Sequence, residues 1–136
     1  MKRIFADACY WIALIHRNDE LCAAADAAKE QLADAILVTT DEVLVEFLNF
    51  INAKAPHLRA TAAHVVEKLR SDPNVCIHEQ SRSSFDEGLG RYKKFHDKEW
   101  SMVDCVSFEL MAREGMREAL TNDHHFEQAG FVRLMT

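Results

Sequence analysis

The sequence has few of the residues that interrupt regular structure. Among 136 residues there are only 4 Gly and 2 Pro, whereas hydrophobic residues make up 49%. This composition excludes a disordered or collagen-like chain, which would need far more Gly, Pro or charge. The chain also lacks an internal repeat, and its length suits one compact domain. We therefore predict a single domain over residues 1–136 with one active site.

Long apolar runs and paired cysteines are missing as well. The first apolar stretch, Ile4–Ala6, is too short for a signal peptide or a membrane span, so we expect a cytoplasmic protein. The cysteines form no Cys-x-x-Cys pair, which argues against a zinc knuckle or a redox motif. We expect buried free thiols at Cys9, Cys22, Cys76 and Cys105.

Several classes of phosphate-handling protein are excluded by motifs that the sequence lacks. There is no Gly-rich turn of the Rossmann or P-loop type. A haloacid-dehalogenase-like phosphatase needs a second acid two residues after Asp7, where this chain has Cys9. A receiver domain needs an Asp at the end of the third strand, where the sequence is Val75–Glu79.

Basic residues are not in excess. The formal net charge is −6, which argues against electrostatically dominated binding of nucleic acid. If four acids held a metal ion, however, the rest of the chain would carry a formal charge of −2. Bound cations would then make the local field more positive. The charge therefore weakens a nuclease hypothesis without excluding it.

Short apolar runs alternate with longer helical patterns along the chain. Strands are predicted at Arg3–Asp7, Ala35–Thr39, Val75–Glu79, Glu118–Thr121 and Phe131–Met135. Predicted helices run from a cap at Asn18 or Asp19 to Leu32, from a Thr39-x-x-Glu42 capping box to Lys54, over Leu58–Arg70, from Ser83 or Ser84, and from Ser101-x-x-Asp104. Strands that alternate with helices form parallel sheets covered on both faces. The pattern predicts an α/β fold, a central parallel sheet of about five strands flanked by helices on both faces.

Three acids stand in apolar segments that contain no Lys or Arg. They are Asp7 within Ile4–Trp11, Glu46 within Val43–Ile51 and Asp104 within Trp100–Phe108. A buried charge is tolerated only when it is paired or coordinates a metal. For this reason we expect Glu46 to be buried and the three acids to share a function.

A fourth acid, Asp123, follows the fourth predicted strand, and all four acids are expected at one edge of the sheet. Ligands of open α/β sheets bind beyond the carboxyl ends of the strands. Three of the acids also have a structural explanation: Asp104 completes a capping box with Ser101, Asp123 suits an Asx turn, and Glu46 pairs with a distant Arg. Convergence favours a Mg²⁺ or Mn²⁺ site instead, because hard cations prefer several oxygen ligands. Such a site hydrolyses phosphodiesters with a metal-activated water.

Two other groups of side chains are candidates for a function. His124 and His125 follow Asp123, but no second histidine lies at helical spacing, so a structural role is favoured. Arg91, Lys93 and Lys94 interleave with aromatic residues, a pattern that suits contacts to a phosphate backbone. A solvated end of an amphipathic helix explains the same pattern.

Four blocks of the sequence resemble the acidic motifs of PIN domains. They are Asp7 after a short strand, Thr40-x-x-Val43-x-x-Glu46, Asp97–Phe108 and Thr121–Phe131. Their order and spacing match over essentially the whole chain, and the last two blocks most resemble VapC-type toxins of bacterial toxin–antitoxin pairs. The resemblance implies an RNA endonuclease that uses Mg²⁺ or Mn²⁺. It further implies that Asp7, Glu46, Asp104 and Asp123 are the catalytic metal ligands and that Ser101 and Asn122 orient them.

The resemblance also implies partners: an RNA substrate, a small antitoxin protein and a second copy of the chain in a homodimer, with no membrane. One position departs from the pattern, because many relatives have a hydroxyl residue directly after the first Asp and this chain has Ala8-Cys9. The alternative function is a PIN-like module that binds nucleic acid or a protein without cutting. The full set of acids favours the nuclease, since a pure binder has no need of buried, uncompensated carboxylates.

Overall fold

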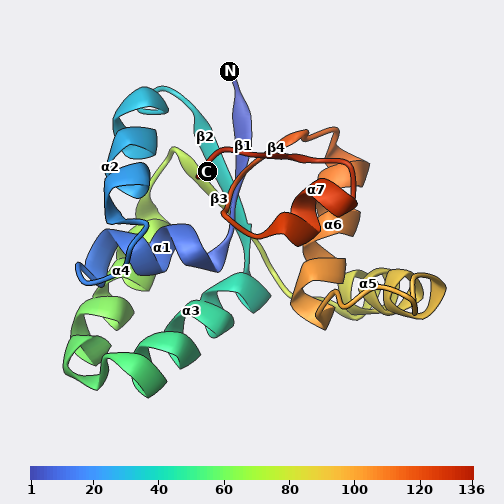
Figure 1. Cartoon of the computed structure of the whole chain (residues 1–136), viewed down its shortest axis with the longest axis horizontal. Coiled ribbons are helices and arrows are strands. Elements are labelled where there is room, and N and C mark those ends of the chain that lie inside the picture. Colours follow the sequence, from blue (N-terminus) through green and yellow to red (C-terminus); the bar gives the residue numbers. More distant parts are fainter.

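A five-stranded parallel sheet forms the centre of the structure, a computed structural model that describes residues 1–136 (Figure 1). The strands are β1 (Arg3–Ala6), β2 (Ile36–Thr40), β3 (Val75–His78), β4 (Glu118–Leu120) and β5 (Val132–Arg133). Their spatial order is β3-β2-β1-β4-β5, and every neighbouring pair is parallel. The order of the strands reverses between β1 and β4, which is where ligands of such sheets bind.

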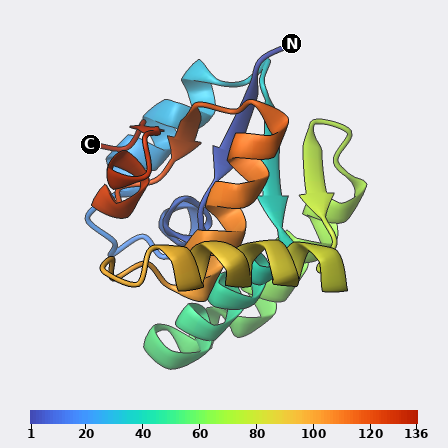
Figure 2. The same ribbon diagram turned by 90° about the vertical axis from the view of Figure 1, so that its right-hand side faces the viewer.

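Helices cover both faces of the sheet, which confirms the predicted fold class (Figures 1 and 2). One group comprises α1 (Ala8–Ile15), α2 (Cys22–Gln31), α3 (Asp41–Lys54), the 3₁₀ turn Pro56–Leu58 and α4 (Arg59–Ser71). The other comprises α5 (Arg82–Lys94), α6 (Met102–Glu114) and α7 (His124–Gln128). In Figure 1, α3 extends beyond the carboxyl ends of the strands. None of the helices combines the length and the apolar character needed to cross a membrane.

The core holds the two groups of helices against the central strand. Ile4, Phe5 and Ala6 of β1 are fully buried, as expected for a strand covered on both faces. On one side of the sheet, the ring of Phe108 on α6 meets that of Phe126 on α7 edge to face, with centroids 4.9 Å apart. This aromatic contact fixes α6 relative to α7, and two of the predicted acids lie at the amino ends of these helices.

Several helix starts differ from the predicted ones. The hydroxyl of Thr39 donates to the carbonyl of Ala6 on β1, so Thr40 caps α3 instead, and its Oγ1 accepts from the amide of Val43. Helix α5 begins after a Ser81/Ser84 capping box, and α2 begins at Cys22 and not next to Asp19. Two short helices, α1 and α7, were not predicted. At the starts of α3 and α5, neighbouring hydroxyl residues competed for the capping position.

The cysteines are free, as predicted, but they are less buried than expected. Only Cys105 is buried, whereas Cys9, Cys22 and Cys76 are partly exposed. Residue type alone does not reveal this partial exposure.

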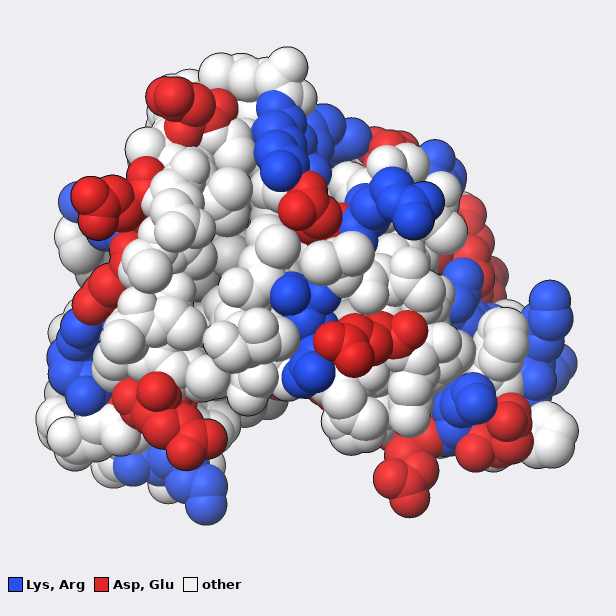
Figure 3. All heavy atoms as spheres, turned by 45° about the horizontal axis from the view of Figure 1, so that its top comes forward, with Lys and Arg blue, Asp and Glu red and all other residues white.

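Charged side chains of both signs are interspersed on the surface. In the view of Figure 3, Lys and Arg are mixed with Asp and Glu, and no continuous basic surface covers this face. Exposed ion pairs such as Lys2 with Glu118, at 2.9 Å, contribute little to stability. On this face, therefore, the structure offers no broad electrostatic attraction for nucleic acid.

The contact between α5 and α6 yields a matched pair of predictions. A Cβ atom added at Gly88 would lie 2.5 Å from Cγ2 and 3.2 Å from Cα of Val106, whereas one added at Gly90 would meet nothing within 4 Å. Gly88→Ala should therefore lower the free energy of unfolding by about 1–3 kcal/mol through overpacking. Gly90→Ala should raise it by about 0.5–1 kcal/mol, because alanine favours the helix. Urea denaturation measures both, and a neutral Gly88→Ala would show that the two helices are not in close contact there.

Candidate active site

The four predicted acids lie at the carboxyl edge of the sheet, on four different elements. Asp7 follows β1, Glu46 lies in the second turn of α3, Asp104 lies in the first turn of α6, and Asp123 precedes α7. Burial raises the pKa of Asp7, and the charges of Glu46 and Asp104 raise it further. Loss of hydration raises the pKa of Glu46, with further contributions from Asp104 and Asp123. The structure thus brings all four carboxylates within electrostatic reach of one another.

Asp7 is the most deeply buried of these acids, with 7% of its surface exposed. Desolvation raises its pKa from 3.8 to about 7, although the hydrogen bond from Thr121 acts in the opposite direction. Such a shift means that an isolated charge here is unfavourable. A bound cation would reverse the effect, because an opposite charge favours the ionised carboxylate.

Thr121 is a buried residue of this site that the sequence reasoning missed. Its hydroxyl donates to Oδ2 of Asp7 at 2.8 Å and accepts from the backbone amide of Asp123 at 3.1 Å. The thiol of Cys9 lies 3.5 Å from the same hydroxyl oxygen. One hydroxyl thus connects the acid that follows β1 with the acid that follows β4. The indication in the sequence was the polar side chain of Thr121 itself, which stands between the apolar end of β4 and Asp123.

This network predicts the effect of removing the hydroxyl. Thr121→Val should leave the Asp7 carboxylate and the Asp123 amide without their partner and lower the free energy of unfolding by about 1–3 kcal/mol. Any activity that depends on a metal bound at Asp7 should fall by about tenfold or more, because the groups that orient metal ligands act on this scale. Thr121→Ser is the matched control and should keep most of both properties. Equal activity of the two variants would show that the hydroxyl does not position Asp7.

Asp104 serves as a helix cap and also faces the other acids. Its Oδ2 accepts from the amide of Ser101, and its own amide donates to Oγ of Ser101, so the predicted capping box is confirmed. The same Oδ2 atom lies 3.3 Å from Nδ1 of His125. Burial raises the pKa of Asp104, more than the hydrogen bond to Ser101 lowers it. The structural role of Asp104 therefore fixes its carboxylate without removing it from the site.

Glu46 is exposed, and the prediction that it is buried was wrong. Helix α3 buries Val43, Leu44, Phe47 and Ile51, which follow the helical period. Glu46 lies on a different side of the helix, next to Val45, which is 52% exposed. The error came from counting apolar neighbours in the sequence rather than those on the same helical face. From this exposed position, the carboxylate of Glu46 still interacts electrostatically with Asp104 and Asp123.

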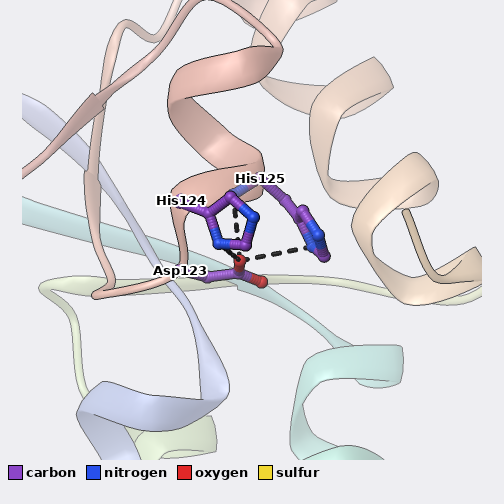
Figure 4. A group of neighbouring side chains, drawn as sticks. All are labelled: Asp123, His124 and His125. Carbon is purple, nitrogen blue, oxygen red and sulfur yellow. Dashed lines mark hydrogen bonds and ion pairs between the residues drawn. The ribbon is translucent and has the colours of Figure 1, made fainter. Parts of the chain in front are cut away.

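Asp123 lies beside two histidines, and both imidazoles are turned toward its carboxylate (Figure 4). Its Oδ1 accepts from the amide of His125 at 2.9 Å and lies 3.3 Å from Nδ1 of the same residue. One potential ligand atom each from Asp123, His124 and His125 lies within 4.8 Å of the others. A purely structural role was favoured for both histidines, and the contacts of His125 with two of the acids were not foreseen.

Comparison with known proteins identifies the family. Residues 4–132 match the PIN domain. The chain belongs to the PIN domain family. Two proteins from Mycobacterium tuberculosis, strains CDC 1551 / Oshkosh and ATCC 25618 / H37Rv, are 31% identical over 134 residues, which are 96% of this chain and 97% of theirs. Both are named 23S rRNA-specific endonuclease VapC20.

A solved structure supports the fold of this PIN domain. The crystal structure of Mycobacterium tuberculosis VapC20, described as a sarcin–ricin loop cleaving toxin, superposes with a TM-score of 0.82. The superposition covers 95% of this chain and 96% of that chain, with 24% sequence identity. The likeness extends over the whole sheet and both layers of helices.

The residues predicted to orient the acids differ in what they contact. Ser101 binds Asp104 in the capping box, as the PIN resemblance implies. The side chain of Asn122 makes no hydrogen bond in the structure; only its backbone is engaged, with the amide bonded to Sγ of Cys9 and the carbonyl to Arg133. The neighbouring Thr121 is the residue whose side chain bonds to Asp7, and a role of Asn122 in orienting the acids stays a prediction.

The three cations at the end of α5 are not equivalent. Arg91 pairs with Glu109 at 2.8 Å, and its guanidinium lies over the ring of Phe95, so it connects α5 to α6. Lys93 and Lys94 are exposed, with Lys94 Nζ 5.5 Å from the centroid of Phe95. The amphipathic interpretation therefore suits Arg91, and contact with nucleic acid stays a prediction for the two lysines.

Proposed function

We propose that this PIN domain is a metal-dependent endoribonuclease and the toxin of a toxin–antitoxin pair. The observation that carries the proposal is the convergence of Asp7, Glu46, Asp104 and Asp123 without a compensating Lys or Arg, since no salt bridge joins any of them to either residue type. Such a group of acids is costly unless a cation binds. The names of the two relatives, which are rRNA-specific endonucleases, support RNA as the substrate.

The donor set suits Mg²⁺ or Mn²⁺, because carboxylate oxygens are preferred by both ions. A divalent ion bound there would lower the pKa of a water molecule and neutralise charge on the scissile phosphate. We assign Asp7, Asp104 and Asp123 as ligands supported by hydrogen bonds to the protein, and Glu46 as the ligand at the exposed rim. Ser101 and Thr121 hold Asp104 and Asp7 in place.

No side chain in the site is suited to attack phosphorus directly. Cys9 is the nearest candidate, but burial raises the pKa of its thiol to about 11, and the charge of Asp7 adds to this shift. The thiol therefore stays protonated and is a poor nucleophile at neutral pH. The nucleophile is therefore not a side chain of the protein, and a metal-bound water is the one that a hydrolytic reaction requires.

The proposal extends to partners that follow from the relatives. The expected partners are RNA, held in part by the exposed Lys93 and Lys94, a small antitoxin protein, and a second copy of the chain. The expected location is the cytoplasm, and the expected organisation is a single domain. A small DNA-binding protein encoded immediately upstream would support assignment as a toxin.

Cleavage of RNA by the purified protein tests the proposed function. 23S rRNA, alone and in ribosomes, is the first substrate to examine, because both relatives are named for it. We expect cleavage with Mg²⁺ or Mn²⁺ and none after addition of EDTA. Cleavage that persists under chelation would exclude the mechanism. RNA binding without cleavage under any metal condition would instead identify a non-cutting PIN module.

A further inference from the structure

His125 lies between two acids that come from different parts of the chain. Its Nδ1 atom is 3.3 Å from Oδ2 of Asp104 on α6 and 3.3 Å from Oδ1 of Asp123 before α7. The side chain of His125 is 18% exposed, compared with 12% for Asp104 and 32% for Asp123. The imidazole therefore lies among the acids and is largely shielded from solvent.

Neither acid needs this imidazole to hold its conformation. The carboxylate of Asp104 already accepts a hydrogen bond from the backbone amide of Ser101. The carboxylate of Asp123 already accepts one from the backbone amide of His125. Backbone amides alone would keep the two carboxylates in place if the ring were absent. The imidazole nitrogen thus adds a potential ligand between two carboxylates that the backbone already holds in place.

The distance from Nδ1 to each carboxylate is close to that between neighbouring ligands on one ion. Ligands at about 2.1–2.2 Å from an octahedral ion are about 3.0 Å apart when they are adjacent. The two contacts of Nδ1, at 3.3 Å each, are close to this value. An ion bound beside the carboxylate of either acid would therefore have Nδ1 within reach as an adjacent ligand.

We propose that Nδ1 of His125 is a nitrogen ligand in the metal site and that it makes the site prefer Mn²⁺ over Mg²⁺. The proposal rests on the proposed function, because it concerns the same metal site. Imidazole nitrogen binds first-row transition metals well, whereas Mg²⁺ strongly prefers oxygen. A site built only of carboxylates would discriminate less between the two ions.

His124 provides an internal comparison. Its side chain is 66% exposed, and its Nδ1 lies 3.8 Å from Asp123. No contact joins it to Asp104. Comparing His125→Asn with His124→Asn therefore distinguishes a role of the imidazole between the two acids from a general effect of losing an imidazole near α7.

Pulsed electron paramagnetic resonance of the Mn²⁺-loaded protein tests the proposal directly. The wild-type spectrum should contain modulation from a ¹⁴N nucleus bound to Mn²⁺. The modulation should persist in His124→Asn and disappear in His125→Asn, whose amide oxygen can take the place of Nδ1 as a ligand. A wild-type protein that binds one Mn²⁺ without ¹⁴N modulation would overturn the proposal, and this result does not depend on whether any variant folds.

Competition between the two ions provides the second measurement. His125→Asn should weaken Mn²⁺ binding by about tenfold or more and Mg²⁺ binding by less than about threefold, with His124→Asn close to wild type. An unchanged ratio of affinities in His125→Asn would contradict the proposal.

Neither measurement uses RNA, so a protein with Mn–N coupling that cuts no RNA would overturn only the proposed function. RNA cleavage that depends on Mn²⁺ and Asp104 but lacks Mn–N coupling would overturn only the inference, and absence of Mn²⁺ binding would overturn both.

Discussion

Asp104→Asn should reduce RNA cleavage by roughly a thousandfold and leave the fold intact, because a metal site that loses an anionic ligand loses most of its ability to activate water. The structure explains why this substitution is informative. An Asn at this position can still accept the hydrogen bond from the amide of Ser101, so the capping box is retained while the negative charge is removed. Expression of the wild-type protein should arrest bacterial growth, and expression of the variant should not.

Asp97→Asn is the control for this experiment. Asp97 precedes the same helix, its side chain is 65% exposed, and its contact is with Lys98 at 3.6 Å. The Asp97→Asn variant should cleave RNA at a rate within about twofold of wild type, because exposed ion pairs contribute little to stability. Equal activity of Asp104→Asn and Asp97→Asn would show that Asp104 is only a helix cap.

The metal-free protein should lose about 4 kcal/mol of stability as the pH rises from about 4 to about 8, chiefly because of Asp7. In the folded state its pKa is raised from 3.8 to about 7 by burial. Between these two values the folded state holds the proton and the unfolded state has released it. The unfolded state therefore binds fewer protons, and the free energy of unfolding falls as the pH rises.

Urea denaturation in EDTA at several pH values measures this effect, with Asp7→Asn as the comparison. The Asn side chain can still accept the hydrogen bond from Thr121, so the variant loses only the titrating group. The difference in stability between wild type and Asp7→Asn should grow with pH and then shrink when Mn²⁺ is added at pH 8. A cation that binds only the folded state adds about 2.7 kcal/mol at a hundredfold excess over Kd. A pH-independent difference would mean that Asp7 is ionised in the metal-free fold.

Periodicity and order of elements were sufficient to predict the fold. β2 was predicted at Ala35–Thr39 and is found at Ile36–Thr40, a shift of one residue that moved the helix cap from Thr39 to Thr40. Such shifts arise because adjacent threonines can each bond to a nearby backbone group, and tertiary contacts decide between them. In this case the hydroxyl of Thr39 donates to the carbonyl of Ala6 on the neighbouring strand, so Thr40 is left to cap α3.

The acids could be predicted from the sequence because the residues that reveal them lie close to them in the sequence. Asp7 and Asp104 stand in short apolar segments, and the capping box of Asp104 lies within four residues. Thr121 and His125 were missed because their partners are distant: the contact of Thr121 with Asp7 spans 114 positions, and that of His125 with Asp104 joins two separate helices. Pairing of this kind depends on how β1, β4 and α6 meet, which no local pattern encodes.

The chemistry of the new RNA ends is the most direct test of the central claim that a metal-activated water cuts the phosphodiester. Cleavage carried out in H₂¹⁸O should place one ¹⁸O atom in the terminal phosphate of the product, and no 2′,3′-cyclic phosphate should form, because water and not the 2′-hydroxyl attacks phosphorus. The reaction should stop in EDTA and resume with Mn²⁺. Products that end in 2′,3′-cyclic phosphate and form equally well in EDTA would contradict the account.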